Sequence, residues 1–568
     1  MQILSLEKVQ TTRLFWLAAG AMFVVMFLTA KQKDPVIVAT AVVLGIVAIY
    51  PLYFWLMGWS HGLPIWPVFS MVHGVTAALP LVQAPLVLEE YTPAQIMAGG
   101  MTLIGFFVLG TVVWLAVTAR PPKPPKKLLM VRVEASHRYL FAFIVAGLFF
   151  VMNALFFWIS LPGNTMQVLR GITLSLNSLG IFVLAFYSGR KMLSKNEDIW
   201  LAVLAALTTL FSAAGLLMAS AIVPVAMLML GYAFGSGKVP WKTVLIILAV
   251  ASVLHPGKFT MRNVVWGGER GPTTLLGMPQ FYAEWIGYGL QQLGISKADY
   301  RDPEQDEVST LFERSGNIHM LLRVQKMSPN EVPFLNGLTY EPIPRLLVPR
   351  FIDDQKGISH AGNVLLSVNY GLQTVEDTRG TSIGWGLVPE AYANFGYVGI
   401  AGLALALALF YSLVTNLTVG VPMTSLRFVL GLLIMAAATT ADTMAIFVTT
   451  QFQGVAGVTV ASFFLMRRQA NPFAAQVGDV LKKTAESRLP QTAVAVGSTV
   501  GPAKWGGFKP PKWAPLSHRK AFELAAARRA AEAAAGENEE KSERGEKMAR
   551  PRQVAVPIQP YYYRSRKA

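Results

Sequence analysis

The feature that most constrains this chain is a series of long apolar runs. About 20 consecutive apolar residues suffice to cross a bilayer, and we identify about twelve runs that approach this length. They lie near residues 14–30, 36–57, 66–83, 97–118, 139–161, 168–188, 199–217, 220–234, 243–255, 396–416, 428–446 and 448–466. The short runs at 220–234 and 243–255 could be tilted, re-entrant or merged with neighbours. The pattern predicts an all-α polytopic membrane protein with about 12 transmembrane helices.

The composition agrees with a membrane protein. Of the 568 residues, 53% are hydrophobic and only 14% are charged, whereas soluble globular chains carry about 25% charged residues. The sequence contains no cysteine, which excludes disulfides, thiolate nucleophiles and cysteine-bound metals. The first apolar run lacks a small-residue cleavage site, so we expect no cleavable signal peptide.

Four basic links orient the expected helices. With twelve spans they all fall on one side, and the positive-inside rule makes that side cytoplasmic, together with both termini. Lys31 and Lys33 fall on the other side and leave the first two spans less certain. The basic residues of the four links are Arg120, Lys123, Lys126, Lys127 and Arg132; Arg190, Lys191 and Lys195; Lys238 and Lys242; and Arg467 and Arg468.

The same topology divides the chain into four parts. We expect an N-terminal transmembrane bundle at 1–255, a large extracytoplasmic loop domain at 256–395 and C-terminal transmembrane helices at 396–466. Loops of such length are usually functional. Residues 467–568 carry 20 Lys/Arg against 9 Asp/Glu and are rich in Pro, Gly and Ala. This composition predicts a cytoplasmic, largely disordered basic tail, which could also anchor weakly to anionic lipid.

Arginines in the outer loop are candidates for binding phosphate. The loop contains 12 Lys/Arg and 15 Asp/Glu, so it is not a nonspecific anion-binding surface. Arg262, Arg323, Arg345 and Arg350 lie at its start, in an expected helix and among prolines. Because the guanidinium group presents a planar set of donors that matches phosphate oxygens, these four residues are predicted to bind a lipid diphosphate. The alternative is that each arginine pairs with a loop acid and only shapes the loop.

The second half of the loop also resembles a known family. The stretches "PIPRLLVPRFIDDQKGISH" and "TSIGWGLVPEAYANFGYVGIAG" resemble bacterial oligosaccharide repeat-unit polymerases, the Wzy-type O-antigen and exopolysaccharide polymerases. The resemblance covers mainly residues 310–415, and "PRFIDDQKG" departs from the Trp-Pro-Asp-Lys-Pro run of related chains. The matching residues are Pro344, Arg345, Pro349, Arg350, Lys356, Thr381, Ser382, Glu390, Tyr392, Asn394, Phe395 and Gly396.

The resemblance implies a fold and a reaction. It implies a GT-C-like, metal-independent glycosyltransferase of the bacterial inner membrane that needs no cofactor. Such an enzyme moves a glycan from undecaprenyl diphosphate onto the terminal hydroxyl of the next lipid-linked repeat unit. Its expected partners are this lipid-linked oligosaccharide, membrane lipids, a chain-length regulator and a flippase.

Residue type and interfacial position select the remaining candidates. Glu390 and His360 are the candidate general bases, although Glu390 could simply cap a helix and His360 could be an ordinary loop histidine. Sugar rings could stack on Trp266, Trp385 and Tyr392, with Trp285 and Tyr370 as further aromatics. An interfacial aromatic belt or the core of the loop is the alternative for these rings.

Other functional classes find less support in the sequence. It has no phosphate-binding glycine loop followed by Lys-Ser/Thr, no zinc-type histidine cluster and no nucleic-acid-binding module. The pair Asp353–Asp354 is not an Asp-x-Asp motif. An O-antigen ligase-like transferase stays open, as does a transporter or scaffold of polysaccharide export. Asp442, within an apolar run, best supports transport, although a polar contact to a neighbouring helix would also explain it.

Overall fold

The computed structural model describes residues 8–28, 30–161, 165–216, 218–266, 274–295, 318–348, 353, 357–380, 382–440 and 442–474. The long helices are α1 (Lys8–Leu28), α2 (Pro35–Leu56), α3 (Ile65–Gln83), α4 (Pro93–Thr118), α5 (Val133–Phe156), α6 (Thr165–Gly189), α7 (Lys195–Ala214), α8 (Met218–Ser236), α9 (Trp241–Trp266), α15 (Leu387–Leu417), α16 (Leu426–Ala438) and α17 (Met444–Leu465). The shorter elements are η1 (Leu86–Leu88), η2 (Leu275–Gly277), α10 (Met278–Gln292), α11 (Ile318–Met327), α12 (Ile343–Leu347), α13 (Ala361–Asn369), α14 (Asp377–Gly380) and two strands, β1 (Lys127–Val131) and β2 (Met466–Ala470).

The helices confirm a multi-pass membrane protein. Within the described ranges, eight helices are long and apolar enough to cross a membrane: α2 to α7, α15 and α17. Shorter apolar stretches lie in α1, α8 and α16. Every run predicted from the sequence overlaps a helix, so the all-α, polytopic class holds, while the count of twelve spans stays a prediction.

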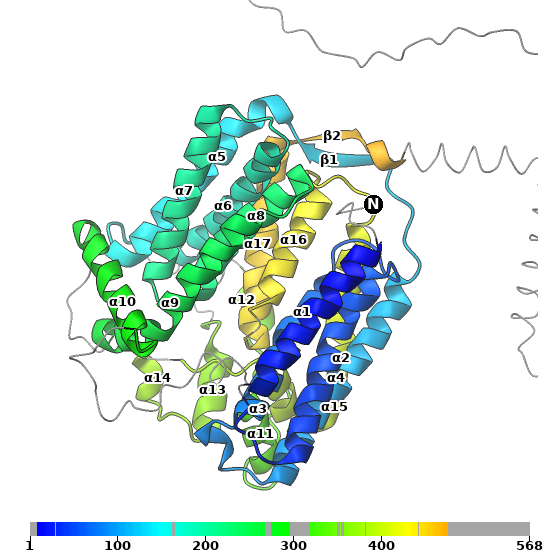
Figure 1. Ribbon diagram of the computed structural model, residues 1–568, viewed down its shortest axis with the longest axis vertical. Coiled ribbons are helices and arrows are strands. Elements are labelled where there is room, and N and C mark those ends of the chain that lie inside the picture. Colours follow the sequence, from blue (N-terminus) through cyan, green and yellow to red (C-terminus); the bar gives the residue numbers. More distant parts are fainter. Residues whose placement is uncertain are drawn as a thin grey trace, which may run out of the picture. The chain divides into compact units, whose positions relative to one another are not determined.

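The two strands are an addition that the sequence did not predict. β1 pairs antiparallel with β2, with Met130 opposite Arg467 and Leu129 opposite Arg468. Figure 1 places this pair at one end of the helices and α11, α13 and α14 at the opposite end. Two of the four basic links therefore lie together, as predicted. Local sequence patterns did not predict the strands, because β1 and β2 are more than 300 residues apart in the chain.

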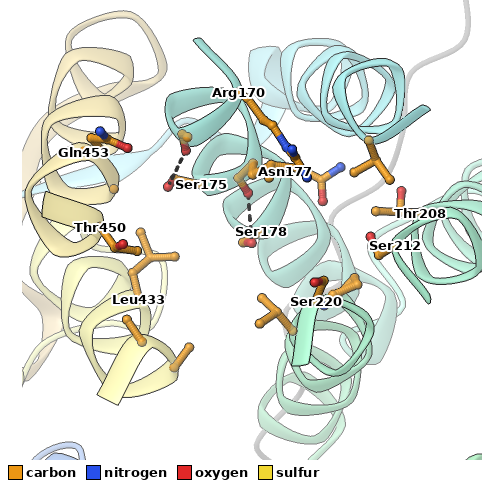
Figure 2. Close-up of a pocket in the computed structure, with 18 of the residues that line it drawn as sticks. Arg170, Ser175, Asn177, Ser178, Thr208, Ser212, Ser220, Leu433, Thr450 and Gln453 are labelled. Atoms are coloured by element: carbon orange, nitrogen blue, oxygen red, sulfur yellow. Dashed lines mark hydrogen bonds between the residues drawn. The ribbon is translucent and has the colours of Figure 1, made fainter. Parts of the chain in front are cut away.

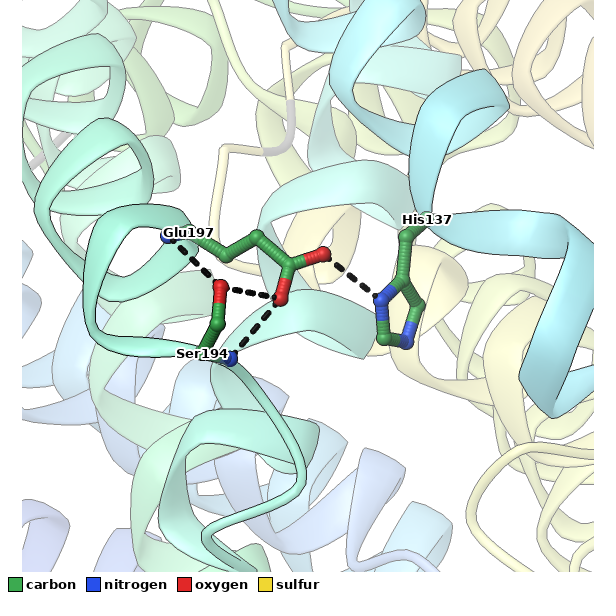
Figure 3. A network of polar contacts seen from close by, with 3 residues as sticks. All are labelled: His137, Ser194 and Glu197. Atoms are coloured by element: carbon green, nitrogen blue, oxygen red, sulfur yellow. Dashed lines mark hydrogen bonds and ion pairs between the residues drawn. The ribbon is translucent and has the colours of Figure 1, made fainter. Parts of the chain in front are cut away.

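A polar network near the basic links fixes two helix starts (Figure 3). Ser194 caps α7 and forms a capping box with Glu197, whose Oε2 accepts hydrogen bonds from the Ser194 backbone N–H and hydroxyl. The other oxygen, Oε1, lies 3.0 Å from Nδ1 of His137 in α5. The network satisfies donors that a helix start leaves unpaired and ties α5 to α7.

The structure corrects two boundaries. The outer loop was expected to begin at Pro256, but α9 continues through this proline to Trp266. Here α9 packs closely on α10, since a Cβ on Gly257 would lie 2.5 Å from the Gly289 nitrogen. The run predicted at 428–446 is also broken, because α16 ends at Ala438. Asp442 therefore lies in the link between α16 and α17, outside both helices.

Candidate functional site

A kink in α15 shapes the site. Phe395 and Gly396 leave the helical conformation, and Gly396 has φ +61° and ψ −146°, a region that glycine adopts far more easily than other residues. The loop at 335–339 fills the break, because the Leu335 and Asn336 N–H groups donate to the carbonyls of Ala393 and Asn394 at 3.0 and 3.1 Å. The first two turns of α15 thereby become a separate unit held against the loop.

Asn394 fastens the loop to this unit. Its Nδ2 donates to the Thr339 hydroxyl and to the Glu390 carbonyl, both at 2.8 Å. Its Oδ1 accepts a hydrogen bond from the Gly337 N–H at 2.9 Å. Asn394 is fully buried and Thr339 nearly so, so these bonds fix the loop beside Glu390.

Glu390 itself is a fully buried carboxylate. Its Oε2 accepts a hydrogen bond of 2.6 Å from the backbone N–H of Met444, the first residue of α17. A carboxylate is well placed there, since unpaired N–H groups give a helix start a partial positive charge. Capping was the alternative considered for Glu390, and the structure shows that it caps α17 rather than its own helix.

Asp442 is the second carboxylate at this place. It is half-buried, and its Oδ1 accepts a hydrogen bond from the Thr443 N–H at 2.9 Å. Its Oδ2 lies 3.4 Å from Nδ2 of the buried Asn363, which is also 3.5 Å from the Ser382 hydroxyl. Both acids lie at the start of α17, because Asp442 accepts from the Thr443 N–H and Glu390 accepts from the N–H of the next residue, Met444. The two acids therefore form one site, of which Asp442 is the accessible member.

Two glycines leave space beside the two carboxylates. A Cβ on Gly362 would lie 3.5 Å from Oε1 of Glu390, and a Cβ on Gly384 would lie 3.6 Å from Oδ1 of Asp442. Any side chain larger than alanine at these positions would compete for that space. Tyr340 also lies near, and burial together with the Glu390 carboxylate raises its pKa well above the usual value. Its hydroxyl therefore remains protonated at neutral pH.

A cavity of about 220 Å³ lies near the site. Its wall includes Gly386, Val388 and Pro389, directly before Glu390, and Thr440, within the α16–α17 link. His73 of α3 also lines it, with Nε2 2.8 Å from the Ala438 carbonyl. Sequence neighbours of both acids line the cavity, but Glu390 and Asp442 themselves do not.

Arg345 is one of the predicted phosphate ligands. It belongs to α12, which packs on α17. Its exposed side chain forms two hydrogen bonds to Asp353, of 2.8 and 3.0 Å. These bonds, and the negative charge of Asp353, raise the pKa of Arg345 above its ordinary value. Exposed ion pairs contribute little to stability, so an incoming anion could replace Asp353.

The other predicted phosphate ligands have different surroundings. The Arg323 Nε donates to the Tyr370 carbonyl at 2.7 Å, and its NH1 lies 3.9 Å from the Glu90 carboxylate. Arg262 lies within α9 rather than in a loop and donates two hydrogen bonds to the Leu216 carbonyl, between α7 and α8. No described contact brings Arg262 to Glu390. Arg350 falls outside the described residues.

The predicted sugar-stacking aromatics are largely core residues. Trp385 is fully buried, donates to the Ser367 hydroxyl at 2.9 Å and packs 5.5 Å from the Tyr370 ring. Tyr392 is 6% exposed and lies against Phe334 and Tyr397. Core packing was the alternative considered for these rings. Trp266 ends α9, but its side chain lies outside the described part of the chain.

His360 begins the helix that serves the site. It is half-buried and stands at the N-terminus of α13, the helix that carries Gly362 and Asn363. Sequence reasoning missed Asn363 and Thr339, which are ordinary polar residues in an unaligned loop. It did single out Asp442, but it assigned that residue to the interior of a span. The available signal was an ionisable residue in apolar surroundings, which often marks function.

Comparison with known proteins gives no relative for this site. No family model, curated protein or solved structure matches the chain. Within the described ranges, no group of three or more His, Asp or Glu side chains is placed to hold a metal ion. The description of the chain therefore rests on its structure, which is that of a multi-pass membrane protein with a carboxylate pair at one end of its helices.

Proposed function

We propose that this protein is a membrane glycosyltransferase that polymerises lipid-linked oligosaccharide repeat units. The observation that carries the proposal is the pair Glu390 and Asp442, which both bind the start of α17, at the end of the helices opposite β1 and β2. With the basic links on the cytoplasmic side, that end meets the outer face of the bacterial inner membrane. Glycans carried on undecaprenyl diphosphate are the substrates at that face.

The chemistry assigns a role to each group. The bond between the sugar anomeric carbon and the diphosphate oxygen breaks, and a new bond forms to the acceptor hydroxyl oxygen. Asp442 accepts the proton of that hydroxyl as general base, because it is the accessible acid. Arg345 neutralises the negative charge that develops on the leaving diphosphate. The reaction requires no metal in this scheme.

Glu390 is assigned a positioning role. It is fully buried, and Oε2 is occupied by the Met444 N–H, so it holds the start of α17 and hence the link that carries Asp442. His360 remains a second candidate for the base.

Two alternative functions, a ligase and a transporter, can be compared with this proposal. A ligase would use the same site with a lipid A-core acceptor, so it differs in acceptor and not in geometry. A transporter is less favoured, because Asp442 lies in a link beside Asn363 and Gly384 and not in the middle of a span. Partner proteins such as a flippase and a chain-length regulator belong to the same proposal.

Polymer length on a gel tests the proposal. A strain that lacks its own copy of the gene would produce either the wild-type chain or one variant. Asp442→Asn should remove the polymer ladder and leave single lipid-linked repeat units, with protein levels unchanged. Glu376→Gln is the control, since Glu376 is an exposed acid directly before α14. A normal ladder from Asp442→Asn would refute its role as the base.

A further inference from the structure

A second and larger cavity lies among the membrane-spanning helices. It has a volume of about 420 Å³ and is bounded by α5 to α8, α16 and α17 (Figure 2). Apolar residues such as Leu155, Leu174 and Val223 form part of its wall. The remainder is polar, and it includes Ser175, Asn177, Ser178, Thr208, Ser212 and Gln453. A wall of this mixed kind is suited to an amphiphile.

Arg170 supplies the only formal charge in this wall. It lies in the second turn of α6, inside the segment that is apolar enough to cross a membrane. Among the described residues it has no hydrogen-bond or ion-pair partner. Figure 2 shows its side chain extending among the polar groups of the cavity. A charge at membrane depth is costly and normally faces a partner or a functional cavity.

A second polar group in the wall also lacks a partner. The Nε2 donor of Gln451, in α17, is buried without a hydrogen bond among the described residues. Unpaired buried donors are uncommon and call for an explanation. The exposed guanidinium of Arg170 and this buried amide are both hydrogen-bond donors. A ligand that pairs with both must be an acceptor, and the guanidinium charge makes an anion the best choice.

Close helix packing fixes the shape of the cavity. A Cβ on Gly171 would lie 2.5 Å from Oε1 of Gln453, and a Cβ on Gly454 would lie 3.1 Å from the Ser175 hydroxyl. On the other side of α6, the buried Asn177 donates to the Ile144 carbonyl of α5 at 3.0 Å. The backbones of α5, α6 and α17 are thus held at short, defined distances, so the site is formed before any ligand arrives.

We propose that this cavity binds the diphosphate headgroup of an isoprenoid lipid, with Arg170 as its phosphate ligand. The guanidinium group pairs with phosphate oxygens through two parallel hydrogen bonds, and the apolar wall accepts the first part of the lipid chain. Thr440 lines this cavity and also the smaller one that contains Gly386 and Pro389. The two cavities therefore meet at the α16–α17 link. The identity of the lipid rests on the proposed function, whereas the phosphate site does not.

Binding to the purified full-length protein tests the proposal. The probe is farnesyl diphosphate, a short isoprenoid diphosphate, and its affinity is measured by thermophoresis in detergent. Arg170→Gln should weaken binding about tenfold or more, as expected for loss of a charge-assisted pair. Arg170→Lys should weaken it less, because it keeps the charge and loses the paired geometry. Arg138→Gln is the control, since Arg138 is exposed at the start of α5.

A second variant tests the site in case Arg170→Gln does not fold. Ser175→Leu keeps the charge of Arg170 but fills the cavity, and it should weaken binding of the probe to a similar extent. Unchanged affinity in both folded variants would overturn the site.

Competition identifies the lipid. Phosphatidylglycerol should displace the probe poorly, and inorganic pyrophosphate should bind only weakly because it lacks an apolar chain. Displacement by phosphatidylglycerol at equal concentration would overturn the isoprenoid assignment and leave a phospholipid site. Because no glycan is present, this measurement succeeds or fails independently of the polymer-ladder assay.

Discussion

The Glu390 carboxylate in α15 receives the Met444 backbone N–H of α17 at 2.6 Å. This hydrogen bond joins two helices whose starts are 57 positions apart in the chain. It also holds the α16–α17 link against the start of α13 at Gly362. The position of Asp442 in space thus depends on a residue that is itself closed to solvent.

Replacing Glu390 tests whether its hydrogen bond to Met444 stabilises the fold. Glu390→Ala leaves the Met444 N–H buried without a partner and should cost about 1–3 kcal/mol of unfolding free energy. Glu390→Gln keeps an acceptor oxygen and should cost less. Thermal unfolding of the purified protein in detergent measures both changes, and Glu376→Ala serves as the control. Equal stability of all three variants would show that the hydrogen bond to Met444 is not important for the fold.

Filling the space at Gly362 tests access to the carboxylates. Gly362→Val places side-chain atoms against Oε1 of Glu390 and the Thr339 side chain, which a Cβ alone would already approach to 3.5 and 3.6 Å. Small displacements of reacting groups lower rates strongly, so polymer yield should fall about tenfold or more. Gly402→Val in α15 is the control, because a Cβ there meets nothing within 4 Å. A full ladder from Gly362→Val would exclude this face as the reaction site.

The kink at Gly396 can be tested by one methyl group. Gly396→Ala forces a side chain into φ +61° and places a Cβ 3.0 Å from the Phe334 ring. Such backbone strain costs about 1–3 kcal/mol, so the protein should unfold at lower temperature. Gly402→Ala, in the regular part of the same helix, should be neutral or stabilising by up to about 1 kcal/mol. Matching behaviour of the two variants would show that the kink is not required.

The absence of cysteine makes the orientation easy to measure. Single cysteines at Val375, beside α14, and at Lys123, between α4 and β1, can be labelled with a membrane-impermeant maleimide. Both side chains are exposed, at opposite ends of the helices (Figure 1). The positive-inside rule predicts labelling of Val375→Cys in intact cells and of Lys123→Cys only after permeabilisation. The reverse pattern would place the carboxylate site in the cytoplasm and exclude the proposed reaction.

The ion pair of Arg345 with Asp353 gives one more prediction. Asp353→Asn should leave polymer length nearly unchanged, because an exposed ion pair adds little to stability. Arg345→Lys should shorten the ladder, since lysine lacks the planar pair of donors that fits a phosphate. If Asp353→Asn were the damaging change and Arg345→Lys the harmless one, the pair would be structural and not a phosphate site.

The sequence predicted the helices well because their signal is local. Apolar runs such as 97–118 fix a helix by composition alone, and α4 follows that run closely. Asn394 and Gly396 were singled out only through a resemblance, yet both prove central to the geometry of α15. Contacts between residues far apart in the sequence leave no local pattern of this kind. Asn363 meets Asp442 across 79 positions, and no periodicity in either segment indicates that contact.

The charged residues show the same limit. A guanidinium in an outer loop can meet a phosphate, a carboxylate or a carbonyl, and the choice depends on tertiary neighbours. Arg323 and Arg262 bind carbonyls of distant segments, which no sequence pattern announces. The cavity of Arg170 is built from six helices, and no local sequence pattern predicts such an arrangement.

The pairing of β1 with β2 sets an order for synthesis. β1 leaves the ribosome more than 300 residues before its partner strand exists, an interval of roughly 20–70 s at ~5–20 residues per second. During that time β1 has no partner strand. The pair can form only after residue 470 has been translated, so the segment between α4 and α5 is joined to the end of α17 when nearly all of the described helices have been made.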